Sequence, residues 1–217
     1  NGKVYYVPGV GIDLTVYYPG CKEERQQIRT ELAVDAEDIV FVYVAELNHN
    51  KNQQQFLRAF RDAFCAGNRP ARAWIVGDGP ARSKMESLSR ELGIDSRVSF
   101  LGFREDIPAV LRGADVAVLL SYREGLPRCL MEACATGLPV IATDIRGNRD
   151  IVDNGVSGIL VNPDDVKTTA KVMKDMAENA HLRKSMGDEG RQRVRMFGLE
   201  QIMPAMQSIY YEWLERY

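Results

Sequence analysis

Short, almost continuous runs of apolar residues recur along the chain, and amphipathic stretches of helical period separate them. A strand in the middle of a parallel sheet is covered on both faces, so its sequence lacks the alternation of apolar and polar positions seen in half-exposed strands. Six runs have this character and predict strands at 39–45, 71–76, 98–101, 116–120, 140–143 and 159–161. The pattern predicts an α/β fold built on a doubly wound, Rossmann-like parallel sheet of about six strands.

The stretches between these runs carry apolar residues at helical spacing. Phe56, Phe60 and Phe64 lie four positions apart and would share one face of a helix. Pro80 suits the first turn of the next helix, and Asp78 suits its N-cap. Helices are therefore expected to cover both faces of the sheet.

The two ends of the chain differ from its centre. Three successive helical stretches, 164–178, 181–194 and 199–217, have no strand between them and predict a C-terminal helical tail that closes the domain. Residues 1–19 contain several prolines and glycines around short apolar patches. We predict that 1–19 is an interdomain linker with a first strand, and that 20–217 is one domain.

Composition excludes several classes of protein. The 28 Lys and Arg residues are balanced by 30 Asp and Glu, a net charge of -2, whereas a nucleic-acid footprint needs a basic face. The longest wholly apolar run has seven residues, and a membrane span needs about 20. The four cysteines match neither zinc nor redox spacings, and only two histidines are present for hydrolytic chemistry. Because no secretory signal is recognisable, we expect a cytoplasmic protein.

Polar residues that follow the fourth predicted strand are the first candidates for chemistry, because ligands of such sheets bind at the carboxyl ends of the strands. Glu124 falls in the loop and Glu132 about one and a half turns into the next helix, so both could face one cleft. Gly125 lets a ligand approach the backbone, and the N–H groups from Leu126 onward suit an anion such as diphosphate. Spacing alone favours a plainer interpretation, in which Glu124 complements the helix dipole and Glu132 is solvated. The apolar neighbours of Glu132 instead indicate that it has a partner.

Residues 124–133, EGLPRCLMEA, resemble the E-x7-E signature of the retaining glycosyltransferases of GT-B fold, family 4 (glycosyl transferases group 1) in particular. Further resemblances span the chain in the order of the family. They are the linker at 7–13 (VPGVGID), the turn at 76–80 (VGDGP), the strand segments at 101–103 (LGF) and 114–116 (ADV), and the turn at 154–161 (NGVSGILV). The resemblance implies the C-terminal, donor-binding half of a larger enzyme, whose acceptor binds an N-terminal domain absent from this chain.

The resemblance also assigns roles by position. It implies that Glu124 contacts hydroxyls of the donor sugar, that Glu132 holds the ribose, and that Lys51 neutralises the diphosphate, with Lys51 and Glu124 as catalytic residues. The further donor-binding candidates are Gly77, Phe103, Gly125, Leu126, Arg128 and Glu46. Glu46 departs from the pattern, because the family usually has arginine there. A carboxylate would repel the diphosphate, so Glu46 either points elsewhere or bonds a sugar or acceptor group, with Arg128 or Arg123 as substitutes.

No Asp-x-Asp pair occurs in the chain, so we expect no metal and no cofactor. The resemblance implies sugar transfer with retention from a nucleotide-diphosphate sugar to a saccharide or lipid-linked acceptor. The segment ELNHNKN at 46–52 resembles a bacterial exopolysaccharide or capsule subgroup, which would place the full-length enzyme at the inner face of the cell membrane. Two alternatives stay open, a non-catalytic nucleotide-binding module and a nicotinamide-dependent oxidoreductase domain. The second is disfavoured because Gly77-x-Gly79-x-x-Arg82 lacks the third glycine of the dinucleotide fingerprint.

Overall fold

A computed structural model describes residues 5, 9, 11–65 and 70–214 of the chain. All the strand pairs of its sheet are parallel, and the strand order is β3-β2-β1-β4-β5-β6. The strands are β1 (Ile39–Val44), β2 (Ala71–Val76), β3 (Val98–Gly102), β4 (Val116–Leu119), β5 (Val140–Thr143) and β6 (Gly158–Val161). The predicted Rossmann-like sheet is confirmed, because each predicted strand differs by at most one residue at either end.

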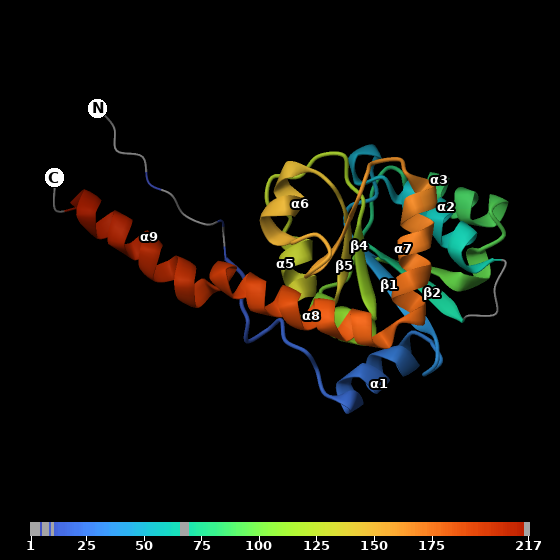
Figure 1. Cartoon of the computed structure of the whole chain (residues 1–217), viewed down its shortest axis with the longest axis horizontal. Helices are drawn as coiled ribbons and strands as arrows, with labels where there is room; N and C mark the ends of the chain where they lie inside the picture. Colours follow the sequence, from blue (N-terminus) through green and yellow to red (C-terminus); the bar gives the residue numbers. More distant parts are fainter. Residues whose placement is uncertain (1–4, 6–8, 10, 66–69, 215–217) are drawn as a thin grey trace.

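Helices cover both faces of this sheet, with α2, α3 and α7 on one side and α5, α6 and α8 on the other (Figure 1). The α-helices in the described part of the chain are α1 (Lys22–Glu31), α2 (Gln53–Phe64), α3 (Arg82–Glu91), α4 (Ile107–Gly113), α5 (Arg128–Ala135), α6 (Arg146–Ile151), α7 (Val166–Glu178), α8 (Ala180–Val194) and α9 (Leu199–Leu214). Three short 3-10 helices are η1 (His49–Lys51), η2 (Asp95–Arg97) and η3 (Arg195–Phe197). The helices that follow the neighbouring strands β1 and β4 therefore lie on opposite faces of the sheet.

The predicted aromatic face of α2 packs onto β1. Phe56, Phe60 and Phe64 are each at most 2% exposed. The ring of Phe64 lies 5.4 Å from that of Phe41, and the ring of Phe56 lies 5.4 Å from that of Tyr43. This packing fixes the start of α2, and with it the loop that leads from β1 into the helix.

The segment before α3 differs from the prediction. The helix begins at Arg82 with Ala81 as its N-cap, so Pro80 precedes the helix. Asp78 is not the cap, since one of its carboxylate oxygens accepts the N–H of Gly79 at 2.7 Å. Hydrogen bonds between this segment and the residues after β1 account for the difference. The N–H of Leu47 donates to the carbonyl of Asp78, and the N–H of Ala81 donates to the carbonyl of Leu47, both at 2.9 Å.

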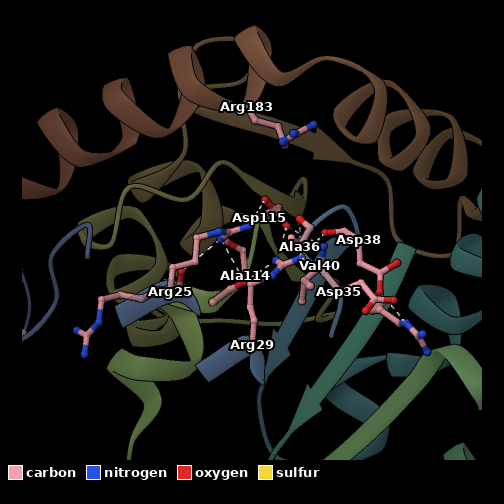
Figure 2. A network of polar contacts seen from close by, with 12 residues as sticks. Arg25, Arg29, Asp35, Ala36, Asp38, Val40, Ala114, Asp115 and Arg183 are labelled. Carbon is pink, nitrogen blue, oxygen red and sulfur yellow. Dashed lines mark hydrogen bonds and ion pairs between the residues drawn. The ribbon is translucent and has the colours of Figure 1, made fainter. Parts of the chain in front are cut away.

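Helix α1, which the apolar pattern did not predict, is held by buried polar contacts at the amino ends of β1 and β4. The Arg29 side chain is 2% exposed and donates to the carbonyl of Gly113 at 3.0 Å and to the Asp115 carboxylate at 3.3 Å. Arg25 reaches the other oxygen of Asp115 at 2.8 Å, and the N–H of Val40 also donates to this carboxylate at 2.9 Å (Figure 2). These contacts lie at the edge of the sheet opposite the one where ligands are expected.

Helix α9 extends away from the sheet, with Ile202 buried near its start and Tyr210 and Trp213 exposed toward its end (Figure 1). The predicted first strand falls largely outside the described residues, and 11–19 contribute only a bridge between Ile12 and Gly198. In the described part of the chain, no helix combines the length and the apolar character needed to cross a membrane.

Candidate functional site

Strands β1 and β4 are neighbours, but the chain leaves them toward opposite faces of the sheet. The segment after β1, residues 45–52, leads into α2, and the segment after β4, residues 120–127, leads into α5 (Figure 1). We call these the β1 loop and the β4 loop. The crevice between two such diverging segments, at the carboxyl edge of a doubly wound sheet, is where ligands bind in this class of fold.

Lys51 and Glu124 meet where the β1 loop and the β4 loop adjoin. The Lys51 ammonium lies 2.6 Å from a Glu124 carboxylate oxygen, and the two side chains are 20% and 11% exposed. The ion pair is thus shielded without being sealed from solvent. Sequence reasoning had selected the two residues separately, one from each loop, and the structure brings them together. A cation next to a carboxylate can receive a ligand that carries both phosphate charge and hydroxyl donors.

Asn50 ties the two loops to each other. Its main-chain carbonyl accepts the N–H of Tyr122 at 2.8 Å. Its side-chain amide accepts the N–H of Arg123 at 3.1 Å and donates to the carbonyl of Arg123 at 3.0 Å. The ring of His49 stacks on Tyr122, with centroids 5.3 Å apart. Sequence reasoning missed Asn50, because its partners lie about 73 positions further along the chain.

Glu132 lies in α5 and is 8% exposed. Arg128, one turn earlier, donates to it at 2.9 Å, and the Tyr17 hydroxyl lies close enough to interact with its carboxylate. Burial raises the pKa of Glu132, while Tyr17 and Arg128 act in the opposite direction by favouring the ionised form. Burial and the charge of Glu132 raise the pKa of Tyr17 to about 12. The predicted partner of Glu132 therefore exists, and Tyr17 is a site residue that no motif indicated.

The β4 loop continues into the amino end of α5, whose first N–H groups have no partner within the helix. Helix α5 begins at Arg128, and Pro127 is its N-cap. A side chain at Gly125 would meet no atom within 4 Å, so that position is open to a ligand. Gly147, in contrast, leaves no room for a side chain, because a Cβ there would come within 2.6 Å of the carbonyl oxygens of both Glu124 and Gly125. Leu126 instead packs against Gly9.

Gly77 and Phe103 occupy different positions relative to this crevice. The N–H of Gly77 donates to the carbonyl of Gly102 at 2.7 Å, and a Cβ at Gly77 would meet the carbonyl of Ala45 at 2.1 Å. Gly77 thus allows the ends of β1 and β2 to pack closely. Phe103 follows the edge strand β3 and is 79% exposed. Three strand spacings, roughly 15 Å, separate β3 from β4, so contact of Phe103 with a donor stays a prediction.

A metal site, or a reactive thiol near the β4 loop and α5, would each place its own demands on the described residues. In residues 5, 9, 11–65 and 70–214, no three His, Cys, Asp or Glu side chains are grouped to hold a metal ion. Burial raises the pKa of Cys129 to about 12 and that of Cys134 to about 12. Because only the thiolate is a good nucleophile, these cysteines are unreactive near neutral pH.

Comparison with protein families decides the relationship. The sequence model of the glycosyl transferases group 1 family matches residues 24–193, most of the chain. The chain belongs to the glycosyl transferases group 1 family. The resemblance drawn from its motifs is thereby confirmed.

Individual relatives of this group 1 chain agree with that assignment. It is 32% identical to the putative glycosyltransferase EpsD of Bacillus subtilis over 216 residues, which cover 99% of the chain and 56% of the relative. It is 30% identical over 188 residues to the UDP-Gal:alpha-D-GlcNAc-diphosphoundecaprenol alpha-1,3-galactosyltransferase of Escherichia coli, covering 82% of the chain and 48% of that protein. The chain thus spans about half the length of these curated relatives.

A solved structure shares the fold of the group 1 chain. The crystal structure of Anabaena Alr3699/HepE in complex with UDP superposes with a TM-score of 0.86 at 23% identity. The match covers 93% of the present chain and 56% of that one. The likeness shows that the two proteins have the same fold.

Glu46 is where the group 1 chain departs from its family motif. Its side chain is exposed, and a carboxylate oxygen accepts from the Asn48 amide at 2.9 Å. Its main-chain carbonyl accepts from Gln53 at 2.9 Å. Lys51 forms its ion pair with Glu124, so Glu46 does not neutralise the lysine ammonium.

Proposed function

We propose that this chain is the donor-binding half of a retaining, metal-independent glycosyltransferase. The enzyme would move a sugar from a nucleotide-diphosphate sugar to a saccharide or lipid-linked acceptor in the synthesis of a cell-surface polysaccharide. Family membership, the match to EpsD and the match to a galactosyltransferase whose name specifies UDP-Gal and a diphosphoundecaprenol acceptor support this proposal. We further propose that the acceptor binds an N-terminal domain of the full-length enzyme, and the fact that the chain spans about half of those relatives supports this.

The observation that carries the proposal is the Lys51–Glu124 pair at the switch point of the sheet. The ammonium would stabilise the negative charge that develops on the leaving diphosphate, together with the N–H groups at the start of α5. A carboxylate has two oxygens with about four acceptor sites, so Glu124 can bond both Lys51 and the hydroxyls of the donor sugar. Glu132 would accept from the ribose hydroxyls. The bond between the anomeric carbon and the diphosphate oxygen would break as the acceptor hydroxyl attacks from the same face, which retains the configuration without a protein nucleophile. The leaving phosphate oxygen would take the proton of that hydroxyl.

Lysine and helix dipole would stand in for a metal ion, because the sequence has no Asp-x-Asp pair to chelate a metal–diphosphate complex. The nicotinamide alternative is disfavoured by topology. Gly77 and Gly79 follow β2 rather than β1, and the N–H of Gly77 already bonds Gly102. A non-catalytic module would share the donor site and would differ only in turnover by the full-length protein.

A thermal-shift screen of the chain against uridine, guanosine and adenosine diphosphate sugars tests the donor assignment. A ligand present at 100 times its Kd stabilises the folded state by about 2.7 kcal/mol, which a melting curve detects easily. NADH serves as the competing ligand. Stabilisation by NADH, with none by any nucleotide sugar, would refute the proposal.

Acidification should weaken donor binding through Glu132. Its raised pKa means that the carboxyl protonates at a higher pH than the ordinary value of 4.5, and a protonated carboxyl loses acceptor capacity for the ribose. The effect on the free chain has the opposite sign. With a raised pKa, the stability that Glu132 contributes is present below its ordinary pKa and is lost as pH rises through the folded pKa. Calorimetry with a nucleotide sugar, whose diphosphate has no titrating terminal oxygen, should show affinity falling as the pH is lowered from neutral toward the ordinary carboxyl pKa of 4.5.

The matched control is Glu132→Gln, which keeps the shape of the side chain and cannot ionise. We expect weaker binding with no remaining pH dependence over that range. An unchanged pH profile in this variant would show that another group titrates, and unchanged affinity would return Glu132 to a purely structural role.

The chain should bind its donor without transferring sugar. Transfer needs a held acceptor hydroxyl and exclusion of water, and both depend on closure against a second domain. Incubation of the chain with the stabilising nucleotide sugar and a panel of soluble and lipid-linked saccharides should yield slow donor hydrolysis at most. Transfer at the rate of the full-length enzyme would place the acceptor site within these 217 residues.

A further inference from the structure

The buried side chain of Tyr43 connects the β1 loop to the β4 loop. It lies in β1, is 0% exposed, and its ring packs on Phe56. Its hydroxyl donates to the main-chain carbonyl of Lys51 and accepts the N–H of Leu120 at 2.7 Å. One buried hydroxyl thus joins the residue that bears the cation to the first residue of the β4 loop.

The backbone of Lys51 is therefore held on both sides. Its N–H donates to the Asn48 side chain at 3.1 Å, and its carbonyl accepts from Tyr43. Burial raises the pKa of Tyr43, so the hydroxyl keeps the proton that it donates. With the main chain fixed and the side chain paired with Glu124, little of Lys51 must be ordered when a ligand binds, which lowers the entropic cost of binding.

We propose that the Tyr43 hydroxyl, together with the Asn50 amide that ties the same loops from the solvent side, positions Lys51 for the diphosphate. This inference rests on the proposed function. Phenylalanine at position 43 would keep the ring packing against Phe56, but the Lys51 carbonyl and the Leu120 N–H would lose their partner. The β1 loop could then shift relative to the β4 loop, and the ammonium would no longer be held at the crevice.

The experiment compares a nucleoside with its diphosphate in Tyr43→Phe. We expect the diphosphate to bind about five- to tenfold more weakly, whereas the nucleoside, which does not reach Lys51, changes less than twofold. Tyr18→Phe is the matched control, because it removes a tyrosine hydroxyl that bonds Glu24 at 2.8 Å, away from both loops. In a Lys51→Ala background, Tyr43→Phe should have no further effect on the diphosphate, since coupled residues are non-additive.

If Tyr43 had only a structural role, Tyr43→Phe would lower the melting temperature and weaken the binding of nucleoside and diphosphate equally. That result would overturn the inference. If Tyr43→Phe does not fold, Asn50→Ala reports on the same linkage from a half-exposed position, and equal losses for both ligands there would also overturn it. A different result would refute the proposed function itself. If Lys51→Ala leaves diphosphate affinity unchanged, the donor assignment is wrong, whereas an effect of Lys51→Ala without one of Tyr43→Phe refutes only the positioning role.

Discussion

Replacing Lys51 with alanine should weaken nucleoside diphosphate binding by about ten- to 150-fold, the range of a charge-assisted hydrogen bond worth roughly 1.5–3 kcal/mol. The upper part of the range is expected, because the substitution also strips Glu124 of its partner at 2.6 Å and leaves an unneutralised carboxylate facing the phosphates. The nucleoside should be affected less than twofold. Affinity of the native chain should also fall as salt rises, because the Lys51 and Glu124 side chains are partly exposed to solvent.

Isothermal titration at two salt concentrations measures this effect, with Lys171→Ala on the exposed face of α7 as a control for the loss of one positive charge. A second variant separates the two contributions. Because a nucleoside diphosphate lacks the transferred donor sugar, Glu124 gives it no hydroxyl contact, and Lys51→Ala with Glu124→Ala should bind it more tightly than Lys51→Ala alone. Equal losses of nucleoside and diphosphate would show that Lys51 is not at the phosphates.

Arg29→Met should lower the free energy of unfolding by about 3–5 kcal/mol, the usual cost of breaking a buried ion pair by removing one partner. The Arg29 guanidinium also donates to the carbonyls of Asp35 and Asp38, each at 2.6 Å. Methionine fills a similar volume but satisfies none of these acceptors. Donor affinity should stay unchanged in the folded fraction, because these contacts lie at the amino ends of β1 and β4, opposite the loops that carry Lys51 and Glu124.

Urea denaturation monitored by circular dichroism measures the loss. Arg61→Met is the matched control, since its ion pair with Asp62 is substantially exposed and such pairs contribute roughly 0–1 kcal/mol. A difference below about 1 kcal/mol between the two variants would mean that water or Arg25 replaces Arg29, and that α1 is held by its few apolar contacts.

Whether a helix could be predicted from the sequence depended on the kind of residue through which it packs. Helix α2 was predicted because it packs through phenylalanines, and such a face is visible in the sequence. Helix α1 was not predicted, because it packs through Arg29 as well as Ile28, and a buried arginine looks like a solvated residue until its acceptors are known. The start of α3 was misplaced, because bonds to Leu47 shape the turn before it.

The candidate site was predictable to a similarly uneven extent. Lys51, Glu124 and Glu132 were predicted because they follow strands or match a family motif; the family is confirmed, and the roles of these residues stay predictions. Tyr17 and Tyr43 carried no signal. Their importance comes from partners far away in the chain, Glu132 for the first and Lys51 with Leu120 for the second.

The sequence by itself determined the strands, their parallel arrangement and the loops on which chemistry would lie, because burial on both faces leaves a local apolar pattern and ligands bind at strand ends. Only the tertiary structure decided which charges face each other. Lys51 and Glu124 are 73 positions apart, and they meet because β4 pairs with β1. Local patterns contain no information on which strands are neighbours, so the ion pair and the loop contacts around it follow from strand order alone.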